Sequence, residues 1–301
     1  MKVIEDNREN GKIPLEQMRL VERKLLREID RICKKYSIPY WLDGGTLLGA
    51  VRHRGFIPWD DDIDVAMLRK DYERFLEIAQ KELPNDIFLQ NWNTEKEFYL
   101  PMTKLRDKYS SIVETENRNL ENHSGIFIDI FPFDYLPQSN WLKNIQMVIF
   151  YILKCFKLEA KASQLKMKTV IGNRTLKIII LTTLQIIGKT IPKTLYKKLF
   201  NLTNKIFYKI SPSKQIGDGL VNPTYYKKSI RNIEKIFPLT TVIFEGEEFP
   251  APKDWDFYLT GLYKNYMELP SVEDRKIHSQ EVYPFKKCNH KETLDWKKRE
   301  E

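Results

Sequence analysis

The sequence predicts an α+β protein, with a mixed β-sheet core flanked by helices and a basic, mostly helical insertion. Apolar positions at helical spacing over 14–36 and 70–83 alternate with short apolar runs of strand length. A Gly pair and an Asp-rich run lie between two such runs, within 40–67. From residue 140 the chain becomes aromatic and basic. We therefore expect three parts, which are a core at 1–139, a basic helical region at 140–235, and a C-terminal segment at 236–301 that returns to the core.

Composition places the chain among ordinary soluble proteins, with 42% hydrophobic and 30% charged residues in 301. Its three cysteines, Cys33, Cys155 and Cys288, are odd in number and far apart. They imply no disulfide framework and favour a reducing compartment. The polar N-terminus has no apolar segment typical of a signal peptide. We therefore expect a cytoplasmic protein.

The net charge of +9 hides a strong asymmetry, because residues 140–235 hold 19 Lys/Arg and only 3 Asp/Glu. Such an asymmetry predicts an anionic partner. Basic amphipathic helices over 141–158 and 176–210 favour an anionic membrane surface, and the uncharged run 178–188 is too short to span a bilayer. The alternative is a helical layer over the core with solvated lysines. Nucleic acid is not expected, because Lys dominates over Arg and no binding motif is present.

The first 50 residues predict a helix, a strand and a glycine turn. The segment 14–36 has helical apolar spacing and begins with Pro14, which suits a helix start, and no chemistry is expected on it. Ile38 to Leu42 is typical of a strand. Gly44, Gly45 and Thr46 follow and lead into a second helix. A Gly pair is often only a turn, but free N–H groups at such a helix start are suited to phosphate.

An Asp-rich run follows this turn, with Asp60, Asp61, Asp62 and Asp64 within five residues. On a strand, Asp62 and Asp64 share one face while Ile63 points the other way. Two carboxylates so placed are suited to Mg²⁺ (or Mn²⁺), which prefers oxygen ligands. A solvated acidic loop is the alternative. Combined with the glycine turn, the run predicts chemistry on a phosphate ester.

The next segment predicts one helix and three strands. The helix covers 70–83, and the strands are expected at 87–92, 99–105 and 111–114. Lys104 and Arg106 are two residues apart, so they face the same side of their strand.

A single carboxylate interrupts the apolar strand predicted over 125–133. Asp129 alternates with Ile128 and Ile130 in the run GIFIDIFPF. An edge position facing water would explain it. A third carboxylate beside the Asp62–Asp64 pair would also explain it, although this stretch alone favours the edge position.

A family resemblance links these features. The run GGTLLGAVRHRGFIPWDDDIDV, residues 44–65, resembles the signature of the LicD family, which includes the fukutin-related proteins. These are transferases with a nucleotidyltransferase-type fold that use CDP-activated donors. The resemblance implies a nucleotidyltransferase-like sheet and transfer of phosphocholine from CDP-choline, with release of CMP. The acceptor would be a hydroxyl of a surface glycan, such as a teichoic acid or lipopolysaccharide, or of its lipid-linked precursor. Ribitol or glycerol phosphate would be the alternative transferred group.

The resemblance also implies roles for individual residues. Asp62 and Asp64 would hold the metal, and FIDIFPFD resembles the family's second motif, so Asp129 becomes the third catalytic and metal-binding carboxylate, with Asp134 as the fallback. Asp129 would orient the metal or take the proton of the attacking hydroxyl. A quaternary ammonium needs an aromatic face, and the candidates are Trp59, Phe56, Trp92 and Tyr99, although such residues are more often part of the core. The residues expected to bind substrate are Gly44, Gly45, Thr46, Arg52, His53, Trp59, Lys104, Arg106, Arg275 and His278.

The C-terminal segment 249–263 resembles the corresponding part of the family. Lys264 and Asn265 stand where the family usually has Gly-Asp, so the geometry of that turn is open. Arg275 and His278 are placed either to reach the donor phosphates or to lie in a solvated tail. A cytoplasmic enzyme of this kind would meet a lipid-linked acceptor at the inner face of the plasma membrane, which would make it a peripheral protein.

Two other classes of protein compete with this interpretation. An ordinary nucleotidyltransferase would move a nucleotide from an NTP and release pyrophosphate. A non-enzymatic, membrane-associated binding protein would keep the Asp cluster as a structural feature.

Overall fold

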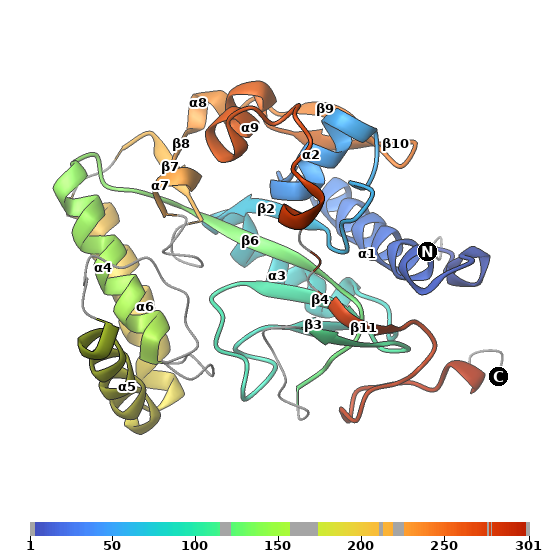
Figure 1. The fold of residues 1–301 in the computed structure, drawn as a ribbon, viewed down its shortest axis with the longest axis horizontal. Helices are drawn as coiled ribbons and strands as arrows, with labels where there is room; N and C mark the ends of the chain where they lie inside the picture. Colours follow the sequence, from blue (N-terminus) through green and yellow to red (C-terminus); the bar gives the residue numbers. More distant parts are fainter. Residues whose placement is uncertain are drawn as a thin grey trace. The chain divides into compact units, whose positions relative to one another are not determined.

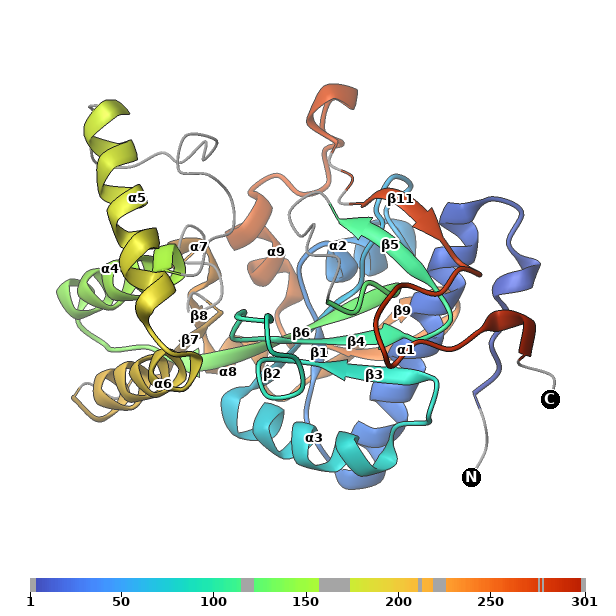
Figure 2. The same ribbon diagram turned by 90° about the horizontal axis from the view of Figure 1, so that it is seen from below.

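A computed structural model describes residues 4–114, 122–156, 174–210, 213–218, 226–275, 277 and 279–298 (Figures 1 and 2). The chain forms two compact units. The first contains Met1–Phe133 and Arg231–Glu301, and the second contains Asp134–Ile230. The predicted basic region, 140–235, overlaps the second unit except at its ends. His278 lies outside the described residues.

The elements of the first unit are η1 (Arg8–Asn10), α1 (Pro14–Tyr36), β1 (Trp41–Leu42), α2 (Gly44–His53), β2 (Asp64–Leu68), α3 (Arg69–Glu82), β3 (Ile87–Gln90), β4 (Thr103–Asp107), β5 (Ser111–Glu114), β6 (Phe127–Tyr135, whose end enters the second unit), β8 (Arg231–Asn232), α8 (Ile233–Ile236), β9 (Thr240–Phe244), β10 (Glu247–Ala251), α9 (Trp255–Tyr263), η3 (Val272–Asp274), β11 (Ser279–Tyr283) and η4 (Trp296–Lys298). The second unit contains α4 (Asn140–Phe156), α5 (Arg174–Thr190), α6 (Lys193–Ile210), β7 (Gln215–Gly217) and α7 (Tyr226–Ser229).

A mixed sheet forms the centre of the first unit, in the strand order β1-β2-β6-β4-β3. β2 and β6 are parallel, and the other neighbouring pairs on this path are antiparallel. Figure 2 shows α3 on one side of these strands and α2 with α9 on the other. Two smaller antiparallel pairs, β9 with β10 and β5 with β11, belong to the same unit. The predicted mixed α and β architecture is confirmed.

Local sequence patterns explain where several elements begin and end. α1 covers the predicted residues, with Met18, Leu25 and Ile29 fully buried on its apolar face. β5 also has its predicted bounds. β4 begins later than expected, because Pro101 has no N–H to donate to a sheet and the strand starts only after it. β3 ends early, where the Asn91 side chain accepts backbone N–H groups and forms a turn.

The second unit is built on three helices. α4 packs against both α5 and α6, and the rings of Phe150 and Phe200 meet edge to face with centroids 4.8 Å apart. Cys155 and Leu181 are buried together between α4 and α5. The basic segment 176–210 is divided into α5 and α6 by a break at Ile191-Pro192. Among the described helices, none is both long and apolar enough to cross a membrane.

Candidate active site

The glycine turn brings two carboxylates to the start of α2. Gly44 has φ of +51°, a conformation that favours glycine. A Cβ atom on Gly44 would lie 3.0 Å from Oδ2 of Asp64, and one on Gly45 would lie 2.8 Å from Oδ2 of Asp60. Side chains at these two positions would therefore push the carboxylates away from the helix N-terminus.

Hydrogen bonds fix the start of β2 against the first turn of α2. The Asp64 N–H donates to the Thr46 hydroxyl at 2.8 Å, and the Asp43 N–H donates to the Asp64 carbonyl at 3.0 Å. The Asp43 carboxylate caps α2 by accepting the N–H of Gly44 at 2.7 Å. In the described part of the chain, the N–H groups of Gly45 and Thr46 have no acceptor. The first turn of α2 therefore offers donors to an anionic ligand, as the pattern predicts.

Asp64 and Asp129 are direct neighbours in the sheet, since they are partners in the register of the parallel pair β2 and β6. Burial raises the pKa of the Asp64 carboxyl well above its usual value, and repulsion from Asp62, Asp129, Asp43 and Asp60 raises it further. The carboxylates around Asp64 therefore repel one another when they are ionised. A bound cation would relieve this repulsion.

The donor set suits a metal that is only partly held by protein. Among the described residues, no three His, Cys, Asp or Glu side chains form a group that could hold a metal ion. Mg²⁺ is commonly bound through one or two carboxylates, with waters and substrate phosphates as its other ligands. Asp62 and Asp64 fit such a two-carboxylate site, because the two carboxyl groups are close enough to repel each other and a divalent cation between them would offset that repulsion. The metal itself stays a prediction.

Lys104 lies directly opposite Asp129 in the pairing of β4 with β6. Its Nζ is 3.2 Å from Oδ1 of Asp129, and both side chains are largely buried. The third predicted carboxylate is thus held by a cation from the neighbouring strand.

Arg106 has different surroundings from Lys104. It is fully buried and donates to Oε1 of Gln90 at 2.5 Å and to the carbonyl of Gly125 at 2.7 Å. Its guanidinium is therefore engaged inside the protein. The predicted contact of Arg106 with substrate is untested.

Arg52 and His53 lie at the far end of α2 from the glycine turn. At 1.5 Å per residue, the backbone of Arg52 is about 12 Å along the helix from Gly44. Arg52 Nη1 donates to the Tyr266 carbonyl at 2.8 Å, and its Nε donates to Nε2 of His53 at 2.9 Å. Burial and the neighbouring Arg52 charge lower the pKa of His53. The backbone of this pair is therefore far from the glycine turn, but the Arg52 guanidinium interacts electrostatically with Tyr263 and Asp60, which lie beside that turn. The predicted roles of Arg52 and His53 stay untested.

The segment after η3 lies over the Asp-rich loop. The Arg275 guanidinium stacks on the Trp59 ring, 4.3 Å from its centroid. The Ser279 N–H donates to Oδ2 of Asp61 at 2.6 Å. Two predicted substrate-binding residues, Arg275 and Trp59, are thus in contact beside the acidic cluster.

Sequence reasoning missed two residues of α1, where no chemistry was expected. Arg19 Nη2 donates to the carbonyls of Ile57 and Asp60, at 2.9 and 2.7 Å, and so holds the loop that precedes β2. Glu22 is fully buried, and neither of its carboxylate oxygens has a hydrogen-bond partner in the described chain. Burial raises the pKa of Glu22 well above its usual value, and the aspartates at 60–62 raise it further. A position four residues after Met18 lies on the apolar face, and this spacing is the signal that could have identified Glu22.

Helix α9 brings the C-terminal segment to the glycine turn. The sequence predicted that this segment returns to the core, but it did not predict which residues meet the turn. The Tyr263 hydroxyl is 3.8 Å from the Cβ position of Gly44. Burial and the nearby aspartates, Asp64 foremost, raise the pKa of Tyr263. The Tyr258 hydroxyl donates to the Asp43 carboxylate. Lys264, whose position the family usually fills with Gly, has φ of +60°, so this lysine keeps a backbone conformation that glycine favours.

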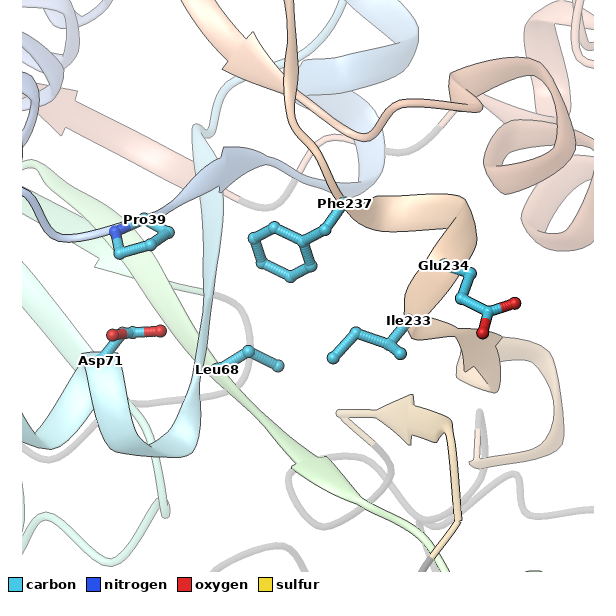
Figure 3. A pocket seen from close by; sticks show the side chains of 6 residues that line it. All are labelled: Pro39, Leu68, Asp71, Ile233, Glu234 and Phe237. Carbon is cyan, nitrogen blue, oxygen red and sulfur yellow. The ribbon is translucent and has the colours of Figure 1, made fainter.

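A separate pocket of about 390 Å³ lies at the other end of β2 (Figure 3). It is mainly apolar and is lined by Pro39, Leu68, Asp71, Ile233, Glu234 and Phe237. None of the predicted site residues lines it, so its volume does not locate the candidate active site.

Comparisons with known proteins show which family the chain resembles. Residues 37–162 match the family model described as LicD/FKTN/FKRP, nucleotidyltransferase domain. The chain is 32% identical over 277 residues to the lipopolysaccharide cholinephosphotransferase LicD of Haemophilus influenzae, covering 90% of this chain and 98% of that protein. It is 27% identical over 136 residues to human ribitol 5-phosphate transferase FKRP, covering 42% of this chain and 24% of that protein. Mouse ribitol-5-phosphate transferase FKTN is 25% identical over 111 residues, 37% of this chain and 20% of that protein. The chain belongs to the LicD family.

Proposed function

We propose that this protein transfers phosphocholine from CDP-choline to a hydroxyl of a surface glycan, or of its lipid-linked precursor, and releases CMP. The relative that aligns over 98% of its length is named a lipopolysaccharide cholinephosphotransferase. One observation carries the proposal for this chain. Asp64 and Asp129 are neighbours at the strand end, beside N–H groups of α2 that have no acceptor in the described chain. We also propose that the sheet is of the nucleotidyltransferase type.

Phosphoryl transfer depends mainly on positioning and on neutralising charge. The N–H groups of Gly45 and Thr46 would bind phosphate oxygens of the donor. Mg²⁺ (or Mn²⁺), held by Asp62 and Asp64, would supply Lewis-acid neutralisation of the pyrophosphate charge. Asp129 would accept the proton of the attacking hydroxyl, with its carboxylate oriented by Lys104.

The donor's choline group requires an aromatic face for its quaternary ammonium. Trp59 is the residue we assign to it. Arg275 covers one face of that ring, so the ammonium would use the other face while the guanidinium reaches the phosphates.

We place the reaction in the cytoplasm, at the inner face of the plasma membrane. A glycan precursor of a teichoic acid or a lipopolysaccharide is lipid-linked there, and its hydroxyl groups are accessible to a peripheral enzyme. The basic helices of the second unit support this location.

A second candidate is the transfer of ribitol or glycerol phosphate from the corresponding CDP-donor. The names of the FKRP and FKTN relatives, both ribitol phosphate transferases, favour it. Nucleotidyl transfer from an NTP is a third reaction that the same carboxylates would serve. The released product separates it from the others, since it gives pyrophosphate in place of CMP.

A donor panel tests the proposal. CDP-choline, CDP-ribitol and CDP-glycerol are each incubated with the protein, a glycan acceptor and Mg²⁺, and CMP release is measured. We expect the highest rate with CDP-choline, dependence on the metal, and no turnover by a folded Asp62→Asn variant. Faster release from CDP-ribitol would favour the second candidate. Pyrophosphate release from an NTP, with no CMP from any donor, would overturn the proposal.

A further inference from the structure

Helix α6 carries an apolar stripe that faces away from its packing partners. Leu195, Leu199, Leu202 and Ile206 are 36–55% exposed. They follow one another at steps of four, three and four residues, so they form one line along the helix. The buried face is a different one that begins at Tyr196, which is 3% exposed. Water therefore contacts aliphatic side chains along more than two turns of α6.

A row of lysines borders this stripe. Lys198, Lys205 and Lys209 are exposed and lie about 70° to one side of it around the helix axis. The helices themselves carry no acidic residue, because α4, α5 and α6 together contain ten Lys/Arg and no Asp or Glu. The exposed side of α6 is therefore both apolar and strongly positive.

The two neighbouring helices extend this character. On α5, Ile179 and Ile186 are 56% and 60% exposed and lie seven residues apart, two turns along one face. On α4, Trp141, Ile145 and Val148 are 40–63% exposed, and they follow one another at steps of four and three residues. We define the apolar–basic surface as the exposed stripe of α6 together with its three lysines, and the stripes of α4 and α5 are further exposed apolar residues of the same unit.

Polar groups beside the stripes are already satisfied within their own helices. The hydroxyls of Thr183, Thr190 and Thr203 donate to backbone carbonyls one turn earlier, at 2.7–2.8 Å. Threonine bonded in this way presents its methyl group outward and needs no water. An apolar environment would therefore cost these positions little.

We propose that the apolar–basic surface binds an anionic lipid bilayer, with α6 lying in the plane of the interface. The aliphatic stripe would enter the boundary between headgroups and acyl chains, and the lysine row would bind anionic headgroups. Nucleic acid fits less well, because it would pair with the lysines but leave the aliphatic stripes in water. A second copy of the protein would bring like charges together. Membrane binding is argued from the surface alone. Only its biological purpose, which is access to a lipid-linked acceptor, rests on the proposed function.

Vesicle sedimentation tests the surface without any turnover. The full-length protein is mixed with phosphatidylcholine vesicles that contain or lack phosphatidylglycerol, and the bound fraction is measured at low and high salt. We expect binding only to the anionic vesicles, weakened by salt. Replacing Lys198, Lys205 and Lys209 together by Gln should lower vesicle affinity about 100-fold, because each lysine near an anionic surface contributes about 1 kcal/mol. The same change at the exposed lysines 70, 81 and 253 of the first unit is the matched control and should have little effect.

A second pair of variants tests the apolar part. Ile206→Ser should lower vesicle affinity about tenfold, whereas Ile243→Ser, at a residue of equal exposure on β9, should not. CMP release from a water-soluble acceptor should be unchanged in all these variants, so failure of the surface and failure of the transferase can be told apart. Equal binding to neutral vesicles, or binding to RNA with none to anionic vesicles, would overturn the proposal.

Discussion

The two units concentrate opposite charges, which are partly buried in the first unit and exposed to solvent in the second. In the first unit, the carboxylates around Asp64 are close to one another and partly buried, and Lys104 from the neighbouring strand pairs with Asp129. In the second, Lys198, Lys205 and Lys209 of α6 face solvent. Buried charge is costly unless a partner compensates it, whereas exposed charge costs little. This contrast supports our proposals that the acidic site takes a small cationic or phosphate ligand and that the basic helices bind an extended anionic surface.

The largest expected effect is on the rate of CMP release, which should depend on the acidic site of the first unit and not on the basic helices of the second. Asp64→Asn should lower CMP release about 1000-fold, because it removes a ligand charge at the reacting phosphates. Binding to anionic vesicles should not change, because α6 is untouched. The two measurements are made on the same preparation, with thermal melting to show that the variant is folded. Activity within tenfold of the parent protein would break the assignment of the acidic site.

The next effect concerns the compensation of buried charge. Lys104→Met should lower the free energy of unfolding by about 3 kcal/mol, because it leaves Asp129 without its neighbouring cation. Lys108→Met is the control, since Lys108 pairs with the half-exposed Glu292 and should cost less than about 1 kcal/mol. Urea denaturation measures both. The double variant Lys104→Met/Asp129→Asn should recover most of the loss, and no recovery would show that the pair is not what Lys104 stabilises.

Sequence reasoning succeeded where the causes are local. The bounds of α1 follow from helical periodicity and Pro14, and those of β5 from a short apolar run, so both were predicted to the residue. Alternation along one strand identified Asp129, but its position beside Asp64 came from the family resemblance and needed the structure to be seen.

The remaining features depend on contacts between distant segments. Lys104 opposes Asp129 only because β4 and β6 pair in one register, which no local pattern specifies. Asp60 approaches Gly45 through the path of a loop, so it could not be distinguished from its neighbouring aspartates. Arg52 was chosen for phosphate by charge alone, and its hydrogen bond to the Tyr266 carbonyl and its interactions with Tyr263 and Asp60 depend on the path of the C-terminal segment.

A smaller effect concerns the unpaired carboxylate of α1. Burial and the neighbouring aspartates raise the pKa of Glu22 in the folded protein. The folded state therefore binds this proton more tightly than the unfolded state, and stability falls as pH rises above the usual value near 4.5 toward the raised one. Glu22→Gln cannot ionise, so it should raise the free energy of unfolding by about 2 kcal/mol at pH 8 and by much less near pH 4.

Glu28 on the same helix is the matched control for Glu22. It is also buried, but it forms an ion pair with Arg31 at 2.9 Å. Glu28→Gln should therefore lower stability at pH 8, the opposite sign. Chemical denaturation at several pH values measures both variants, and a loss of stability in Glu22→Gln would show that a partner compensates this carboxylate.

The smallest effect uses one substitution in both regions. Thr46 is buried, and its hydroxyl accepts the Asp64 N–H, so Thr46→Val leaves that donor unpaired and should cost about 1–2 kcal/mol. Thr183 is exposed on α5, and its hydroxyl donates to the Ile179 carbonyl. The backbone N–H of the next turn can still donate to that carbonyl when the hydroxyl is removed. Thr183→Val should therefore change the free energy of unfolding by less than about 0.5 kcal/mol, and it should leave vesicle binding equal or tighter. Thermal denaturation and vesicle sedimentation measure the pair. An equal loss of stability at both positions would mean that Thr183 is as constrained as Thr46. It would contradict the contrast between a preorganised acidic site and a basic surface that tolerates substitution.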